Sequence, residues 1–291
     1  MAITIDSAFI EEYEDNVRHL AQQSDVRLRP HTYEVNSGGE AYNFERLGPS
    51  EAEEKIGRRQ DTSYIDDDWS RRVATPRTFN HTMTIEHEDK VQMLVDPEST
   101  YAQSQGNAMR RAYDRIIIEA CTGAALYGDG TSEDLATAAP DQIIGDGTTP
   151  ISFDMLTAAQ EQYMKNEIMP DEAKIIAVGP TQVRKLMQLT EQTSADYVQA
   201  QALQRYGIVP NWLGFTWIVS NLLEADTPGD DLYCVSFTRR GIGLAVNQDT
   251  FTRIGENPEK QYMIQVFSQW TAGAFRTEDE HFVVLHVADT L

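Results

Sequence analysis

The sequence has few cysteines, no long apolar run and a shortage of basic residues. Its two cysteines among 291 residues, Cys121 and Cys234, form no metal-ligand or redox spacing, so we expect two buried reduced thiols. No stretch of eighteen apolar residues occurs. The first residues, MAITIDSAFIEEYEDN, are acidic where a signal peptide would be basic and then apolar. We therefore expect neither secretion nor a membrane span.

The shortage of basic residues leaves 24 Lys and Arg against 46 Asp and Glu, a formal net charge of −22. This charge argues against a protein that grips nucleic acid by neutralising phosphates, which requires clustered Lys and Arg. It is compatible with a wall that encloses DNA, because a basic lining would bind the polymer and hinder its movement. Acidity also keeps ordinary proteins soluble, so charge alone indicates no function.

Catalytic and cofactor motifs are missing as well. There is no Gly-x-Ser-x-Gly, no His-Glu-x-x-His and no phosphate loop, and with 46 acids no carboxylate pair stands out. His81 and His87, with Glu86 and Glu88, could suggest a metal site. On a strand, however, the two histidines would lie about 20 Å apart. We expect no enzyme, no metal and no cofactor.

Three Gly-containing turns resemble binding loops without completing them. Asp129 and Asp146 lie in Gly-Asp-Gly sequences that lack the further oxygen donors of a calcium loop, so we interpret both as turns. The sequence from Arg240 to Ala245, RGIGLA, has two of the three glycines of a dinucleotide loop and lies between expected strands.

The most regular stretch runs from Asp96 to about Tyr127. Asp96 followed by Pro97 is a helix start. Apolar and small residues then recur at spacings of three and four, with arginines and Asp114 on the other side. The pattern predicts a helix about 45 Å long, longer than a small domain is wide. The expected buried face carries Ala102, Gln105, Met109, Ala112, Ile116 and Ala120.

Before this helix the sequence predicts an arm, strands and a polar excursion. Residues 6–23 form a short amphipathic helix with one apolar stripe, from Phe9 through Tyr13 and Val17, which must dock on something. A turn at 36–39 separates two alternating segments, and residues 77–94 alternate as a long strand. From Gly48 to Pro76 the chain has dense charge of both signs and cannot form a core of its own.

Two interpretations of this excursion are open. It is a disordered loop, or an extended loop whose charges are satisfied by a neighbouring copy of the chain. The mixed signs and the aromatic anchors favour the second interpretation. The expected contact residues are Glu51, Glu53, Glu54, Lys55, Arg58, Arg59, Asp66, Asp67, Asp68, Trp69, Arg71 and Arg72, with Phe9, Tyr13 and Val17 of the arm.

After the long helix, residues 128–150 are a linker rich in Gly, Asp and Thr. A mixed α/β unit follows, with helices at 153–167, 181–189 and 194–206 and strands at 173–180, 214–223, 231–237 and 241–246. Two closing strands joined across residues 273–280 then return to cover the long helix.

In this order the segments resemble the Hong Kong 97 fold of tailed-phage major capsid proteins. The matching pieces are RRVATPRTF into MTIEHEDKVQM, the helix DPESTYAQSQGNAMRRAYDRIIIEA, YGDGT, IIAVGPTQVRKLM, GFTWIVSNLL, GIGLAV and WTAGAFRTEDEHFVVLHV. The resemblance implies an α+β fold with an N-terminal arm (1–30) and an extended β-hairpin loop (31–76). It also implies a peripheral domain (77–130, spine helix 96–127), a linker (131–150), an axial α/β domain (151–261) and peripheral closing strands (262–291).

The implied function is mechanical. Hexamers and pentamers of the chain would close an icosahedral virion shell around double-stranded DNA, without sequence-specific contacts and without a membrane. The resemblance also implies assembly in the host cytoplasm, a portal and, in some relatives, a decoration protein. We expect a separate scaffolding protein and no cleavage, because only about thirty residues precede the loop. Some relatives crosslink a loop lysine to an asparagine, but Lys55 alone gives no basis to expect this.

Two alternatives are open from sequence. An encapsulin-type nanocompartment has the same fold but packs enzymes, and the long charged loop favours the viral interpretation over it. A soluble α/β enzyme would instead be a monomer or a small oligomer.

Overall fold

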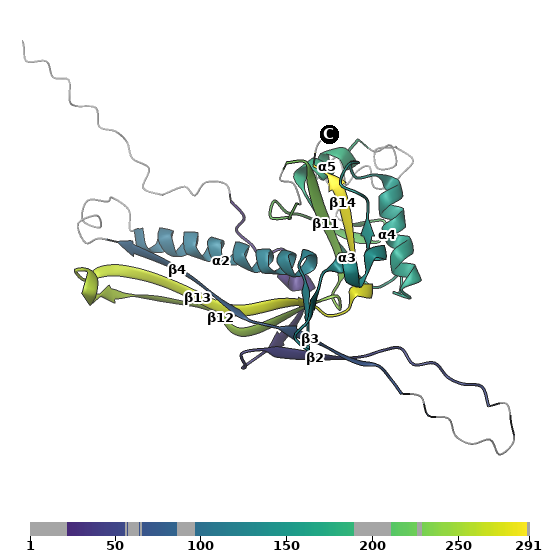
Figure 1. Ribbon diagram of the computed structural model, residues 1–291. Helices are drawn as coiled ribbons and strands as arrows, with labels where there is room; N and C mark the ends of the chain where they lie inside the picture. Colours follow the sequence, from purple (N-terminus) through teal and green to yellow (C-terminus); the bar gives the residue numbers. More distant parts are fainter. Residues whose placement is uncertain are drawn as a thin grey trace, which may run out of the picture.

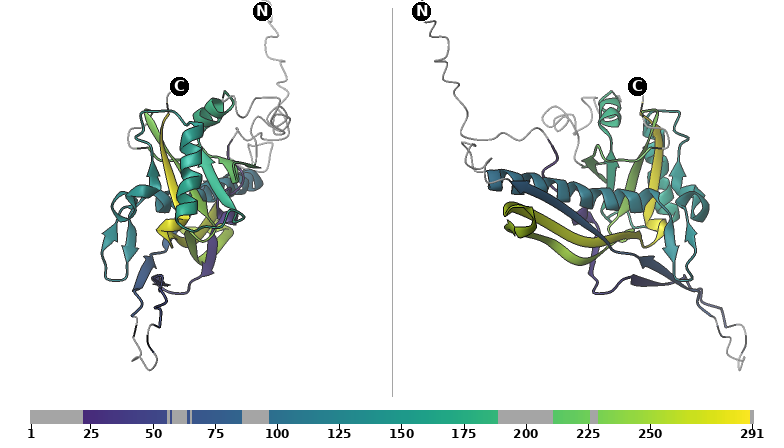
Figure 2. Two further views of the ribbon diagram at one scale, coloured as in Figure 1. Left: turned by 90° about the vertical axis from the view of Figure 1, so that its right-hand side faces the viewer. Right: turned by 60° about the vertical axis from the view of Figure 1, so that its left-hand side comes forward.

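The computed structural model describes residues 22–55, 57, 64, 66–85, 97–188, 211–225 and 229–289, of which 97–102 are described by their backbone. An elongated layer, in which a long helix lies along a β-hairpin, carries a compact α/β unit at one end (Figure 1). A two-stranded ribbon leaves the junction of these parts and points away from both (Figures 1 and 2). The predicted arm helix at 6–23 falls almost wholly outside the described residues.

The long helix, α2, runs from Pro97 to Thr122 and is therefore about 39 Å long. It begins where the sequence predicts, but the predicted continuation to Tyr127 is wrong. After Gly123 the chain enters strand β5, Ala125–Tyr127. A Cβ atom at position 123 would lie 2.6 Å from the carbonyl oxygen of Glu119, so the helix ends where a side chain no longer fits.

The buried face of α2 agrees in part with the predicted stripe. Gln105, Met109 and Ile116 are at most 4% exposed, as expected. Asp114, which the sequence placed on the solvent side, is only 1% exposed, because the segment before the first strand covers it. The solvent-facing prediction for Asp114 is therefore wrong.

A four-stranded sheet with the order β1-β12-β13-β4 packs under α2. β13 (Met263–Arg276) pairs antiparallel with β12 (Ile242–Asn257) and with β4 (Arg77–Ile85), while β1 (Tyr33–Asn36) adds only four parallel residues beside β12. Trp270 of β13 stacks on Tyr113 of α2 with ring centroids 3.9 Å apart and on Phe79 of β4 at 4.5 Å. This three-ring stack, in which Trp270 and Tyr113 are buried and Phe79 is half-buried, fixes the helix on the sheet. The predicted strand at 77–94 is β4 as far as residue 85, and its remainder lies outside the described residues.

The compact unit is built on a six-stranded sheet of order β7-β14-β11-β8-β10-β9. One face packs against α4 (Phe153–Lys165) and α5 (Pro180–Leu186), whereas the other contributes Ile175 and Ala177 to the core around α2. The compact unit and the elongated layer therefore share a core. The six strands have these bounds: β7 (Ile143–Ile144), β8 (Lys174–Val178), β9 (Asn211–Trp212), β10 (Phe215–Val219), β11 (Asp231–Thr238) and β14 (Phe282–Ala288).

This topology corrects two of the expected domain boundaries. The last strand, β14, pairs with β11 in the compact unit, so the assignment of 282–288 to the domain of the long helix is wrong. The outer half of β12 pairs with β13 under α2, so residues up to 257 do not all belong to the compact unit. Long-range strand pairing decides both boundaries. The helix predicted at 194–206 lies outside the described residues.

The third sheet has the order β2-β3-β5-β6 and contains the ribbon. β2 (Tyr42–Leu47) pairs with β3 (Trp69–Ala74), and β3 also pairs with β5, which pairs with β6 (Ser132–Glu133). The turn at 36–39 does not close a hairpin, because β1 pairs with β12 instead. The short helices are η1 (Arg29–His31), α3 (Leu135–Ala138), η2 (Pro140–Gln142), η3 (Pro258–Lys260) and η4 (Asp279–His281).

The predicted turns and thiols are confirmed. Asp129 and Asp146 each accept the backbone N–H of the threonine two residues later, at 2.9 and 3.0 Å, and the intervening glycines have positive φ. Cys121 and Cys234 are buried and unpaired, and burial raises the pKa of Cys234 to about 12. No helix within the described ranges combines the length and apolar character needed to cross a membrane.

Candidate inter-subunit surfaces

The ribbon has two faces of different character, because successive strand residues point to opposite sides. On its inner face Tyr42 and Phe44 lie against Phe275 of β13, with ring centroids 6.0 Å apart in both pairs. This inner face therefore belongs to the chain's own core.

Charged residues anchor the base of the ribbon. Arg72, 1% exposed, forms an ion pair with Asp279 and lies over the ring of Tyr127 at 4.1 Å from the centroid. Arg276 contributes a second buried guanidinium 3.4 Å from the same carboxylate, and burial lowers its pKa. Arg72 was predicted to contact a neighbouring copy. That prediction is wrong, since its side chain is enclosed by its own chain.

The outer face of the ribbon is exposed and amphipathic. Arg71 of β3 donates a 2.7 Å hydrogen bond to Glu45 of β2, so these two charges are satisfied within the chain. The next cross-strand pair is apolar: Leu47 lies opposite Trp69, and the two residues are 53% and 71% exposed. Trp69 also borders a concave region of about 420 Å³ whose lining includes Tyr127 and Gly128. An exposed aromatic beside a concave surface is typical of an interface anchor.

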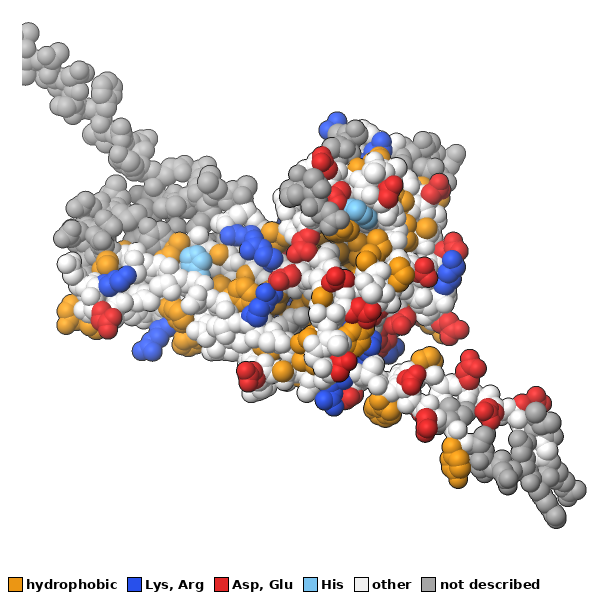
Figure 3. Space-filling model, viewed as in Figure 1, with side chains coloured by type: hydrophobic (Ala, Val, Ile, Leu, Met, Phe, Trp, Pro, Cys, Tyr) orange, Lys and Arg blue, Asp and Glu red, His pale blue; other side chains and the backbone are white. Residues whose placement is uncertain are grey.

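Beyond this pair the loop carries mostly acidic side chains. Tyr64 is 90% exposed, and the loop residues leave the body of the molecule (Figure 3). All of the described predicted contact residues at this end are exposed: Glu51, Glu53, Glu54, Lys55, Asp66, Asp67, Asp68 and Trp69. Arg58 and Arg59 lie outside the described residues, as do Phe9, Tyr13 and Val17 of the arm.

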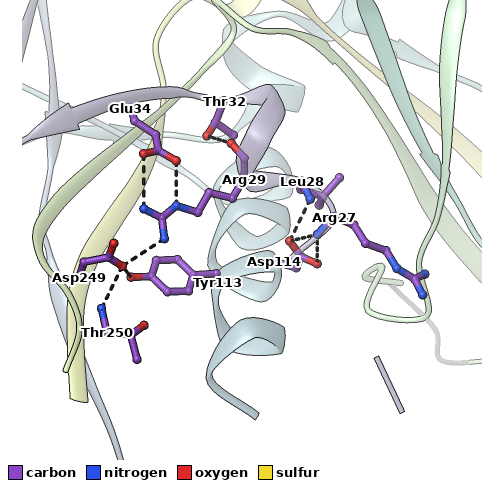
Figure 4. A network of polar contacts seen from close by, with 9 residues as sticks. All are labelled: Arg27, Leu28, Arg29, Thr32, Glu34, Tyr113, Asp114, Asp249 and Thr250. Carbon is purple, nitrogen blue, oxygen red and sulfur yellow. Dashed lines mark hydrogen bonds and ion pairs between the residues drawn. The ribbon is translucent and has the colours of Figure 1, made fainter. Parts of the chain in front are cut away.

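A polar network that the sequence did not indicate joins residues 27–34, the root of the arm, to the body of the molecule (Figure 4). Arg29 donates to Glu34 at 2.8 Å and to Asp249 at 3.2 Å, and these bonds raise its pKa. Tyr113 donates to Asp249 at 3.2 Å. Asp249 lies where the β12–β13 register is irregular, between Gln248 and Phe251. Partners this distant in sequence leave no local signal.

Asp114 forms the second half of this network. Its carboxylate accepts the backbone N–H groups of Arg27 and Leu28 at 3.0 to 3.2 Å. It therefore holds the chain before η1 against α2 and stabilises two backbone donors that have no strand partner.

The outer half of the β12–β13 hairpin is a further exposed surface that the sequence did not indicate. Within the described residues β1 covers β12 only at Gly243–Val246. Beyond this segment Phe251 and Ile254 are 48% and 49% exposed, and Tyr262 at the tip is 59% exposed. Such an uncovered strand edge can pair with another chain.

Among the described residues, no group of three or more His, Cys, Asp or Glu side chains is placed to hold a metal ion. His81 lies on β4, whereas Glu86, His87 and Glu88 fall outside the described ranges. The RGIGLA sequence forms the turn between β11 and the start of β12, where it opens no helix.

Comparison with known proteins gives a consistent result. The model of one family, described as phage capsid protein, matches residues 5–289. No curated protein matches the sequence.

Solved structures resemble the whole chain. The capsid structure of cyanophage P-SCSP1u is similar at TM-score 0.75 and 16% identity, over 100% of this chain and 96% of that chain. A structure from Mycobacterium phage Che8 is similar at TM-score 0.73 and 16% identity, over 96% of this chain and 97% of that chain. The capsid asymmetric unit of cyanophage Pam1 is similar at TM-score 0.74 and 11% identity, over 99% of both chains. At these identities the likeness establishes the fold.

Proposed function

The chain belongs to the phage capsid protein family, and from this membership we propose how it builds its shell. It is a structural, shell-forming protein of the virion with the Hong Kong 97-like fold of tailed-phage major capsid proteins. Neither an encapsulin-type compartment nor a soluble enzyme is favoured by the family match. We propose that hexamers and pentamers of this chain form an icosahedral shell around double-stranded DNA.

The exposed outer face of the ribbon carries this proposal. Leu47, Trp69 and Tyr64 are 53%, 71% and 90% exposed on a segment that extends away from the body. A solitary molecule gains nothing by exposing these side chains, whereas a neighbouring copy can cover them. The ribbon and its acidic loop therefore lie on a second copy, which makes a head-to-tail contact of the kind that closes rings.

Affinity in this arrangement comes from many modest contacts. The loop has six described acids and one lysine, all exposed, so each ion pair it forms contributes little by itself. Summed over several neighbours, such contacts hold a closed shell. The tip of the compact unit meets its copies at the five-fold and six-fold axes, and the N-terminal arm contacts a neighbouring copy.

Other components complete the particle. Because weak head-to-tail contacts do not by themselves fix the curvature of a shell, a separate scaffolding protein directs assembly in the host cytoplasm. A portal occupies one vertex, and a decoration protein is compatible with the exposed surfaces. Subunits stay uncrosslinked, so denaturing gels of mature particles show the unchanged subunit mass.

Electron microscopy of purified particles tests the proposal. DNA-filled particles with a portal vertex support it, whereas shells loaded with protein cargo contradict the DNA-enclosing role. Light scattering provides the second arm. If the full chain forms only monomers or small oligomers at every concentration, with the scaffolding protein present, the shell assembly proposed here is wrong.

A further inference from the structure

A cluster of arginines that form no ion pair with a described carboxylate lies on a chain whose formal net charge is −22. We define the arginine patch as Arg27, at the root of the arm, with Arg110, Arg111 and Arg115 of α2. Arg27, Arg110 and Arg115 are exposed and Arg111 is half-buried. Lys and Arg side chains lie over the middle of the molecule, where α2 meets the compact unit, with Asp and Glu side chains beside them (Figure 3).

None of the four arginines forms an ion pair with a carboxylate among the described residues. Arg110 donates to the carbonyl of Ser24 at 2.9 Å, and Arg111 to the side-chain oxygen of Gln22 at 2.8 Å. Arg27 donates to the carbonyl of Val219. The nearest acid on the helix, Asp114, is buried and accepts backbone N–H groups instead. Arginines elsewhere, such as Arg29, Arg71 and Arg77, each pair with a carboxylate.

The donors of the patch are largely unused. Arg27, Arg110 and Arg111 each donate through Nη1 alone, so Nε and Nη2 have no partner among the described residues. A guanidinium has five N–H donors in a fork that matches phosphate oxygens. A groove of about 420 Å³ lies beside the patch, with a lining of Gln22, Gln23, Arg27, Arg111, Asn221 and Leu222. The side-chain amides of Gln22 and Asn221 add further donors, whereas the amide of Gln23 already donates to Asp25 and Asp114.

The surroundings distinguish a phosphate chain from an acidic peptide. Protein interfaces centre on buried apolar or aromatic anchors, whereas non-specific nucleic-acid binding requires mainly cations placed along the backbone. No large hydrophobic side chain is exposed on the described part of α2 (residues 103–122) or within residues 22–32. Arg111 and Arg115 are one helical turn apart, about 6 Å along the axis, so both can reach one strand.

We infer that the arginine patch binds the phosphate backbone of the nucleic acid enclosed by the shell. This inference rests on the proposed function, and it places the exposed side of α2 toward the lumen. The acidic remainder of the chain keeps the polymer from adhering everywhere, while a few regularly repeated cations position its outermost layer.

Fluorescence anisotropy with a labelled duplex DNA measures the contact in the unassembled full chain. Four neutralised phosphates correspond to a slope of about −3.6 in log K against log salt, a roughly 150-fold loss of affinity between 50 and 200 mM salt. The variant Arg110→Gln/Arg111→Gln/Arg115→Gln retains only Arg27. Its loss over the same range falls to about 3- to 4-fold.

Two controls separate charge from structure. Arg184→Gln/Arg239→Gln/Arg253→Gln removes the same charge from exposed positions elsewhere and leaves the salt slope of wild type. The single variant Arg115→Gln removes a side chain with no intramolecular partner among the described residues, so it leaves folding intact and reduces the slope by about 0.9.

The outcomes distinguish this inference from the proposed function. Particles that assemble normally while the two triple variants bind DNA equally would overturn the inference and leave the shell function intact. Patch-dependent binding to polyglutamate but not to duplex DNA would assign the patch to an acidic protein and also overturn it. An image of DNA-filled particles with α2 on the outer surface would do the same. Absence of any shell would instead contradict the proposed function.

Discussion

At the scale of single residues, Asp114 is the clearest case of a polar side chain with a structural role. Its carboxylate satisfies two backbone N–H groups that precede η1, inside the protein and away from water. Such a buried acceptor costs more to remove than an exposed one, because its donors are left unpaired.

We expect Asp114→Asn to lower the free energy of unfolding of the unassembled chain by about 1 to 3 kcal/mol, measured by denaturant titration. The amide keeps the shape but replaces one acceptor oxygen with a donor. The control Asp25→Asn changes an exposed acid in the segment before η1, which Asp114 holds. Its free energy of unfolding should stay within about 0.5 kcal/mol of wild type. Equal stability of the two variants would contradict the assigned role of Asp114.

Asp249 makes the stability of the chain depend on pH. The backbone N–H of Thr250 and the guanidinium of Arg29 hold the pKa of this carboxyl below its ordinary value. Its contribution to stability is therefore complete above the pKa of the unfolded chain, about 3.9, and is lost as the pH falls through the lower folded pKa. Asp249→Asn should narrow the difference in thermal midpoint between pH 7 and pH 3. An unchanged difference would show that the network with Arg29 contributes nothing to acid sensitivity.

At the scale of elements, the end of α2 depends on a single glycine. A Cβ atom at Gly123 would lie 2.6 Å from the backbone oxygen of Glu119, whereas one at Gly106, inside α2, meets nothing within 4 Å. Gly123 directly follows α2 and Gly106 lies inside it, so the two positions form a matched pair.

Gly123→Ala should destabilise the chain by about 1 to 3 kcal/mol, because the helix end and β5 must shift to relieve the contact. Gly106→Ala should stabilise it by about 0.5 to 1 kcal/mol, since alanine loses less backbone entropy in a helix. Thermal or denaturant unfolding of both variants measures the difference. Two changes of the same sign would contradict this explanation of where the helix ends.

At the scale of the whole molecule, stability and assembly depend on different surfaces. The ribbon's inner aromatics pack on Phe275, but its outer Leu47 and Trp69 contact mainly solvent in the isolated chain. Assembly can therefore be weakened without unfolding the subunit.

Leu47→Ala/Trp69→Ala should leave the unfolding free energy within about 0.5 kcal/mol per substitution. It should raise the concentration needed for shell formation by about 30-fold, the size of one interface anchor. Sedimentation and electron microscopy across a concentration series measure this threshold. The control Met164→Ala/Met169→Ala removes similarly exposed apolar side chains from the compact unit and should have a smaller effect. An equal threshold in wild type and the ribbon variant would remove Trp69 as an anchor.

Local patterns were sufficient wherever a structure depends on neighbours in sequence. The start of α2 at Pro97, its buried Met109 and Ile116, the Asx turns at Asp129 and Asp146 and the order of the segments were all predicted, because periodicity and turn chemistry are short-range. That order also led to the correct family.

Tertiary structure alone decided the rest. The pairing of β14 with β11, the burial of Asp114 under the arm root and the ion pair that encloses Arg72 join residues distant in sequence, and no local pattern encodes such pairs. The three arginines of α2 are neighbours already in the sequence, but only the fold adds Arg27 to them and buries Asp114 away from them. Composition determines the average charge of this chain, but only the fold determines where that average is reversed.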